Sequence, residues 1–165
     1  MNKHFEYPQE NLVWATKHNP HNRDFSCIHC AQPVSASPLI SRVQNRNHCP
    51  YCLWSRHLDL YEAGDRLSAC KGAMRPIGIT FKRARNRYAS GQGELMIVHR
   101  CADCGRLSLN RAAADDDPDL ILSLPELSTT LKADVIRQLK LEGIDLVQND
   151  RIYEVRKQLQ GALCG

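Results

Sequence analysis

Six of the eight cysteines in the chain stand in pairs of the form Cys-x-x-Cys. The first two pairs are Cys27/Cys30 and Cys49/Cys52, and 18 residues separate them. Two residues between paired cysteines let both thiolates reach one tetrahedral ion, and two pairs at this separation are typical of a four-cysteine zinc site. We therefore predict that these four residues hold one zinc ion.

A second zinc ion is predicted at the third pair, Cys101 and Cys104. Cys70 is the natural third ligand of this site. His99 lies two residues before Cys101, on the same side of a strand, and is our first choice as the fourth ligand. The alternatives for this position are His57 and His48.

The spacing alone does not decide which pairs share a metal. Cys52 and Cys101 are separated by 48 residues, against 18 between the first two pairs. Loop closure then favours the local pairing by only about 0.9 kcal/mol. A cross-braced arrangement, with pairs shared between sites, stays open. Cys164 is predicted to be a free thiol.

Two catalytic alternatives use residues of the same region. Cys49-Pro50-Tyr51-Cys52 has the letters of a glutaredoxin active site, but a redox pair needs a low-pKa thiol at a helix N-terminus, after a strand that the preceding segment does not offer. Asn47 and His48, with His57 and Asp59 following, are similar to the His and Asn of zinc-braced HNH nucleases. The ββα segment of those nucleases is not visible. We expect His48 to make a structural contact near the thiolates instead.

The composition agrees with a small metal-stabilised domain. Apolar residues make up 42% of the chain but aromatic residues only 6%, so few bulky side chains exist to fill a large core. Structural zinc contributes on the order of 10 kcal/mol to folding such a domain. The longest apolar run falls far short of the ~20 residues that span a bilayer, and no secretory signal is visible. We predict a cytoplasmic protein with reduced thiols and no membrane contact.

Basic and acidic residues are concentrated in different segments of the chain, although its net charge is only +4. Residues 81–111 carry seven basic and two acidic residues, whereas residues 112–131 carry five acidic residues and no basic one. We predict three parts: an N-terminal arm (1–23), a two-zinc domain (24–114), and an acidic linker with a helical tail (115–165).

A long β-hairpin is predicted in the basic region. Residues 77–85 and 94–100 have the composition of strands, and Gly91-Gln92-Gly93 between them is a turn signal. Its exposed cations could bind phosphates. The residues that we assign to nucleic-acid binding are Lys82, Arg83, Arg85, Arg87, Arg100 and Arg46.

The tail is predicted to form an antiparallel helical hairpin. A first helix, capped by Ser128 or Thr130, ends at Gly143, and a second begins at Asn149 or Asp150. The fold class is a small zinc-stabilised α+β fold with two zinc-knuckle or zinc-ribbon-like sites, a β-hairpin and this helical hairpin. The apolar stripes of the two helices contain Leu131, Val135, Ile136 and Leu139, and Ile152, Val155, Leu159 and Leu163.

The run Arg46-Asn47-His48-Cys49-Pro50 resembles the signature of the RNHCP domain family, which is named for those five residues. The resemblance covers about residues 22–120 and leaves out the helical tail. It implies a bacterial, zinc-ribbon-like domain without a firmly assigned activity. Other segments that agree with the family pattern are 23–30, 52–59, 64–66, 70–74, 99–105, 110–111 and 115–116.

The leading functional prediction is non-catalytic binding of RNA or a ribonucleoprotein, such as the ribosome, through the basic hairpin. Tyr88, Tyr51 and Trp54 are candidates for stacking on unpaired bases, although for Trp54 we favour a place in the core. The alternative is a protein–protein adaptor. In that case Asp115-Asp116-Asp117 and the helical tail dock a partner, such as a GTPase or another assembly factor. The three aspartates could also be a charged helix start or a loop near Arg111.

Overall fold

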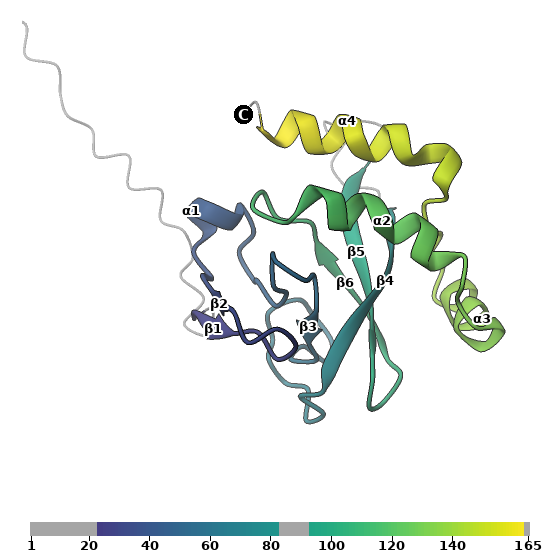
Figure 1. The fold of residues 1–165 in the computed structure, drawn as a ribbon. Coiled ribbons are helices and arrows are strands. Elements are labelled where there is room, and N and C mark those ends of the chain that lie inside the picture. Colours follow the sequence, from purple (N-terminus) through teal and green to yellow (C-terminus); the bar gives the residue numbers. More distant parts are fainter. Residues whose placement is uncertain (1–22, 83–92, 164–165) are drawn as a thin grey trace, which may run out of the picture.

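The computed structural model describes residues 23–82 and 93–163, which form two antiparallel sheets and four α-helices (Figure 1). The strands are β1 (Phe25–Ser26), β2 (Pro33–Val34), β3 (Ser55–Arg56), β4 (Ala73–Lys82), β5 (Glu94–Cys101) and β6 (Leu107–Arg111). The helices are α1 (Pro38–Ser41), α2 (Pro118–Ser128), α3 (Ala133–Leu141) and α4 (Ile152–Leu163), and the 3-10 turn η1 (Asn149–Arg151) leads into α4. One sheet pairs β1 with β2, and the other has the order β3-β4-β5-β6.

The predicted pairing of two strands is confirmed as β4 and β5, which form the centre of the larger sheet, whereas the end of the first predicted strand and most of the turn signal lie outside the described residues. Both strands are rich in β-branched and other apolar residues and are buried along most of their length. The register shifts between Pro76 and Gly78. A Cβ at Gly78 would lie 3.0 Å from the Leu146 side chain, so glycine lets the segment after α3 approach this strand closely.

Helices cover both faces of the larger sheet. Ile121 and Leu124 of α2 and Val155 of α4 pack with Ile79 and Ile97 on one face. The other face carries a second apolar cluster, which α3 covers. Its buried members are Ile77, Val98, Leu107, Val135 and Leu139. In the ranges that the structure describes, no helix is both long and apolar enough to cross a membrane.

The C-terminal region differs from the predicted hairpin of two helices. The helices α3 and α4 exist, and Gly143 with φ +68° follows the first of them. They pack on opposite faces of the sheet rather than on each other, because each apolar stripe finds its partners on the sheet. The additional helix α2 begins where Asp117 accepts hydrogen bonds from the backbone N–H groups of Asp119 and Leu120.

Candidate metal centres

All three Cys-x-x-Cys pairs adopt the same backbone turn. In each, the N–H of the residue after the second cysteine donates to the carbonyl oxygen of the first cysteine. The residue after the second cysteine has a positive φ between 59° and 74°. This turn aims both thiols at one point. The three bonds join Ala31 to Cys27 (3.0 Å), Leu53 to Cys49 (2.9 Å) and Gly105 to Cys101 (3.1 Å).

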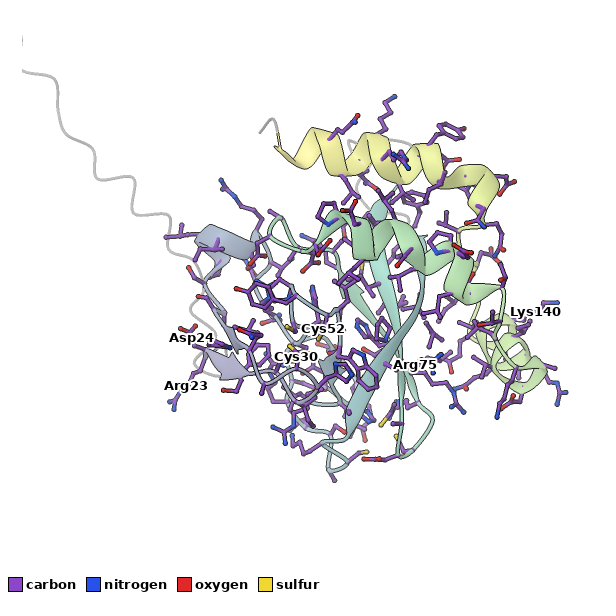
Figure 2. All side chains as sticks on the ribbon, in the orientation of Figure 1. Arg23, Asp24, Cys30, Cys52, Arg75 and Lys140 are labelled. Carbon is purple, nitrogen blue, oxygen red and sulfur yellow. The ribbon has the colours of Figure 1, made fainter. Side chains whose placement is uncertain are left out.

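The first cluster contains Cys27, Cys30, Cys49 and Cys52, whose sulfur atoms all lie within 4.8 Å of one another. Figure 2 labels two of these residues, Cys30 and Cys52. The Sγ atoms of Cys27 and Cys52 are 3.5 Å apart, and those of Cys30 and Cys49 are 3.6 Å apart. Four sulfurs around a zinc ion at 2.3 Å are about 3.8 Å apart in a tetrahedron, so the cluster fits zinc. The local pairing, rather than a cross-braced one, is therefore the one in the structure.

The second cluster contains His57, Cys70, Cys101 and Cys104. The Sγ atoms of Cys70 and Cys101 are 3.7 Å apart, and Nδ1 of His57 lies 3.3 Å from Sγ of Cys104. The backbone N–H of His57 donates to the carbonyl oxygen of Gly72, which holds the histidine beside the loop that carries Cys70. These donors also fit one tetrahedral zinc ion.

His57 is suited to bind metal as a neutral imidazole. Burial lowers its pKa, and the nearby positive charges of Arg106 and Lys71 lower it further, against the opposing effect of Asp59.

Gly72 keeps space around the cluster. A Cβ at this position would overlap the carboxylate of Asp103 and lie 3.1 Å from Sγ of Cys101.

His99, our first choice as the fourth ligand, does not reach the second cluster, and His57 takes that place. The His99 side chain is fully buried, and its Nε2 lies 2.6 Å from the carbonyl oxygen of Leu53. Its Nδ1 lies 3.0 Å from the Asn110 side-chain amide. Burial lowers the pKa of His99 to about 4, with a further contribution from His48. The strand aims His99 into the core before the chain turns at Cys101.

The signature residue Arg46, which we assigned to nucleic-acid binding, is buried, and its guanidinium is held by ion pairs within the chain. Its Nη1 donates to the carboxylate of Asp115 at 2.7 Å and its Nη2 to that of Asp116 at 3.2 Å. Its Nε donates to the carbonyl oxygen of His48 at 3.0 Å. Nε2 of His48 lies 2.8 Å from the same Asp116 carboxylate. The run that gives the family its name thus ties the first metal cluster to the start of α2.

Two further aspartates shape the loop between β3 and Cys70. Asp59 accepts hydrogen bonds from the backbone N–H groups of Gly64 and Arg66 and from the Asn47 side chain. The Asp65 carboxylate accepts four backbone N–H groups, which hold its pKa well below the usual range. No role is predicted from the sequence for Asp65, and Asp59 enters only the nuclease alternative, although both carboxylates lie within the segments that carry the family resemblance.

The other residues assigned to nucleic acid divide into two groups. Lys82 is exposed at the end of β4, and Arg100 is half-buried on β5. The remaining three lie outside the described residues: Arg83, Arg85 and Arg87. Trp54 is half-buried, and its ring stacks on that of His29 with centroids 4.2 Å apart and planes inclined by 5°.

The geometry does not favour the catalytic alternatives. The His48 side chain is 1% exposed and already bound to Asp116, so it cannot reach a substrate without rearrangement. Burial raises the pKa of the Cys49 thiol to about 11, opposite to the shift that activates a redox cysteine.

Two Cys/His clusters on a small antiparallel sheet with flanking helices define a zinc-binding α+β protein. The chain matches the family model of the RNHCP domain over residues 22–122 and belongs to that family. The matched region includes Asp115, Asp116 and the first turn of α2. Searches of curated proteins and of solved structures give no match.

Proposed function

We propose that this protein binds RNA, or a ribonucleoprotein such as the ribosome, in the cytoplasm and without catalysing a reaction. The two zinc sites would hold the binding surface in shape. That surface would extend from the second metal cluster along β4 to Lys82 and the basic residues that follow it in sequence.

The main support for this proposal is the concentration of basic side chains around the second metal cluster. Arg75 of β4 and Arg100 of β5 are directly opposed across the strands. Opposed like charges destabilise a sheet, and a phosphate bound to both would remove that cost. Nε of Arg100 is buried and has no hydrogen-bond partner among the described residues. Exposed cations near the same cluster are Arg56, Lys71 and Arg106.

The charge of the metal site does not cancel this surface. One Zn²⁺ with three thiolates and a neutral imidazole carries a net charge of about −1. Asp103, in the third cysteine pair, adds one exposed carboxylate. The five basic residues named above therefore leave an excess of positive charge that favours an anionic partner.

The proposal is tested by the salt dependence of RNA binding to the zinc-loaded full chain. We expect affinity for fluorescent ribosomal RNA fragments to fall steeply between about 50 and 200 mM salt. The double variant Arg75→Glu/Arg106→Glu should lower the slope of log K against log salt by about 1.5. The matched control Arg137→Glu/Arg156→Glu makes the same charge change at exposed positions of α3 and α4. Equal effects of both variants, or no RNA binding, would contradict the proposal.

The adaptor alternative has less support from the acidic segment. Asp115 and Asp116 bind Arg46 and His48 within the chain, and Asp117 caps α2. These internal contacts explain the three aspartates without a partner. Isolation of the tagged chain from cells with a stoichiometric protein and no RNA would favour the adaptor.

A further inference from the structure

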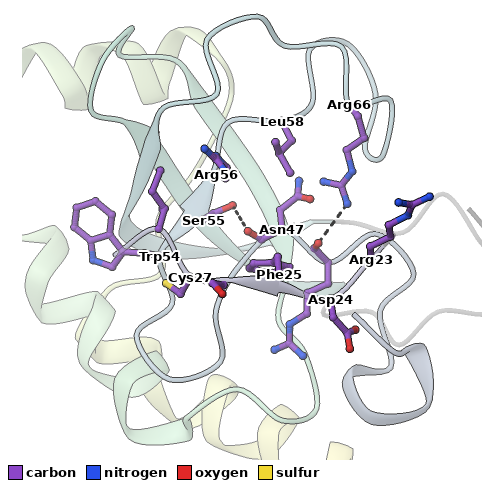
Figure 3. A pocket seen from close by; sticks show the side chains of 13 residues that line it. Arg23, Asp24, Phe25, Cys27, Asn47, Trp54, Ser55, Arg56, Leu58 and Arg66 are labelled. Carbon is purple, nitrogen blue, oxygen red and sulfur yellow. Dashed lines mark hydrogen bonds between the residues drawn. The ribbon is translucent and has the colours of Figure 1, made fainter. Parts of the chain in front are cut away.

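A pocket of about 350 Å³ lies beside the first metal cluster, among β1, β3 and the loop that carries Arg66 (Figure 3). Its size is in the range of sites that hold small organic ligands. The pocket is lined by both apolar and polar side chains. The apolar lining includes Phe25, Trp54 and Leu58, and the polar lining includes Asn47, Arg56 and Arg66.

Asn47 presents an unused hydrogen-bond acceptor in this pocket. The residue is 5% exposed, and its Nδ2 donates to Oδ2 of Asp59 at 2.8 Å. Its Oδ1 is buried and accepts no hydrogen bond from any residue that the structure describes. Buried side-chain oxygens are nearly always paired in folded proteins, so this atom points to a ligand.

Arg66 presents unused donors next to that acceptor. Its Nη2 donates to the carbonyl oxygen of Arg46 at 3.3 Å, and its Nη1 lies 3.6 Å from Oδ1 of Asp59. Within the described chain, its buried Nε and Nη1 have no hydrogen-bond partner. Asn47 and Arg66 thus contact the two oxygens of one carboxylate, Asp59, and Figure 3 shows the Arg66 guanidinium turned toward Asn47.

A ligand that satisfies both groups needs a donor for Asn47 and an acceptor for Arg66. A carboxylate or a phosphodiester has no donor for the Asn47 oxygen. The hydrogen-bonding edge of a nucleobase carries both kinds of group, and its flat face could stack on one of the two aromatic side chains that line the pocket, Phe25 and Trp54. The exposed side chains of Arg23 and Arg56 at the pocket could bind flanking phosphates.

We propose that this pocket binds one unpaired RNA nucleotide, with the base edge held by Asn47 and Arg66. This inference rests on the proposed function and adds that single-stranded RNA, rather than a continuous duplex, is the preferred ligand. Arg46 contributes no free donor, because Asp115, Asp116 and the His48 carbonyl already occupy its guanidinium.

The test measures how tightly the reduced, zinc-loaded full chain binds two RNAs. One is a single strand of eight nucleotides, and the other is a blunt-ended stem in which the same eight nucleotides are base-paired. In a Trp14→Phe background, Trp54 is the single tryptophan and reports on the pocket. Asn47→Ser removes the unpaired carbonyl, and Leu58→Phe fills the pocket without altering its polar groups. Matched controls at exposed positions are Asn149→Ser and Leu141→Phe. Each variant is first checked for two bound zinc ions.

We expect the single strand to quench Trp54 and to bind either pocket variant about tenfold or more weakly, with the controls unchanged. If strand and stem bind equally well, and both pocket variants keep the RNA affinity of the unmodified protein, the proposed role of the pocket is contradicted while the proposal of RNA binding stands. Saturable quenching by a nucleoside 5′-monophosphate with no RNA binding would overturn the proposed function instead, and identify a free nucleotide as the ligand. No response to any probe would overturn both.

Discussion

The two metal clusters share one backbone turn but differ in donors and exposure. The first has four sulfur donors, of which Cys27 and Cys49 are buried, and it packs with Phe25 and Val34 in a small apolar cluster. The second has three sulfurs and one imidazole, and its Cys70 and Cys104 are exposed. Each cluster also has two buried ligands, which in the second are His57 and Cys101, so the difference lies in the other two: Cys30 and Cys52 are half-buried in the first, whereas Cys70 and Cys104 are exposed in the second.

The difference also concerns what surrounds each cluster. The first adjoins the buried network of Arg46, His48 and Asp116, which reaches α2. The second lies at the end of the large sheet among exposed cations such as Arg75 and Arg106. We infer that the first cluster mainly maintains the fold, whereas the second mainly shapes a charged surface.

Loss of the first cluster should have the largest effect. Cys49→Ser removes a fully buried ligand, and structural zinc supplies on the order of 10 kcal/mol to small domains. We expect loss of cooperative unfolding by circular dichroism and a zinc content below two ions per chain. Cys164→Ser is the control and should leave both unchanged. A native melting curve for Cys49→Ser would contradict the inference that the first cluster mainly maintains the fold.

The buried network beside the first cluster should come next. Arg46→Met leaves the carboxylate of Asp116 buried beside His48 without its guanidinium partner. Removing one member of a buried ion pair costs about 3–5 kcal/mol. Urea denaturation should show this loss, whereas Arg75→Met, at an exposed position, should change stability by less than about 1 kcal/mol. Equal stability of the two variants would contradict a structural role for the signature arginine.

Changes at the second cluster should be more local and should identify its fourth ligand. His57→Ala is expected to lower the zinc content from two ions per chain to one, because His57 completes that donor set. His99→Gln should keep both ions, since His99 contacts Leu53 and Asn110 instead. Inductively coupled plasma mass spectrometry of the two purified variants measures this. The opposite result would restore His99 as the ligand.

The smallest effect is expected at the turn of the third cysteine pair. Gly105 has φ +74°, but alanine already occupies the equivalent position of the first pair at φ +61°. A Cβ there would meet the flexible end of Arg100 at 3.1 Å. Gly105→Ala should therefore cost about 1 kcal/mol with both zinc ions retained. Loss of one ion in this variant would show that the third turn is less tolerant than the first.

The cysteine pairs and the central hairpin could be predicted because their signals are local. Two-residue spacing between cysteines determines the turn, and the apolar segments of β4 and β5 flank a glycine-rich turn signal. The C-terminal helices were also predictable, but not their packing on opposite faces. Both stripes have the same helical period, and nothing in that period says which surface each will cover.

The fourth ligand and the role of Arg46 depend on contacts between distant parts of the chain. His57 meets Cys104 across 47 residues, and Arg46 meets Asp115 across 69 residues. His99 lies two residues before Cys101 and therefore on the same face of the strand, but the His99 side chain points into the core. Basic residues likewise look alike in sequence whether they are buried ion-pair partners or exposed cations.

Zinc-edge X-ray absorption on the purified, reduced protein tests the central claim most directly. The structure predicts two zinc ions per chain, one bound by four sulfur atoms and the other by three sulfur atoms and one imidazole nitrogen. The average first shell should therefore be dominated by sulfur at about 2.3 Å with a minor nitrogen contribution at about 2.0 Å. A stoichiometry near zero, or a shell composed mainly of oxygen and nitrogen, would contradict the account.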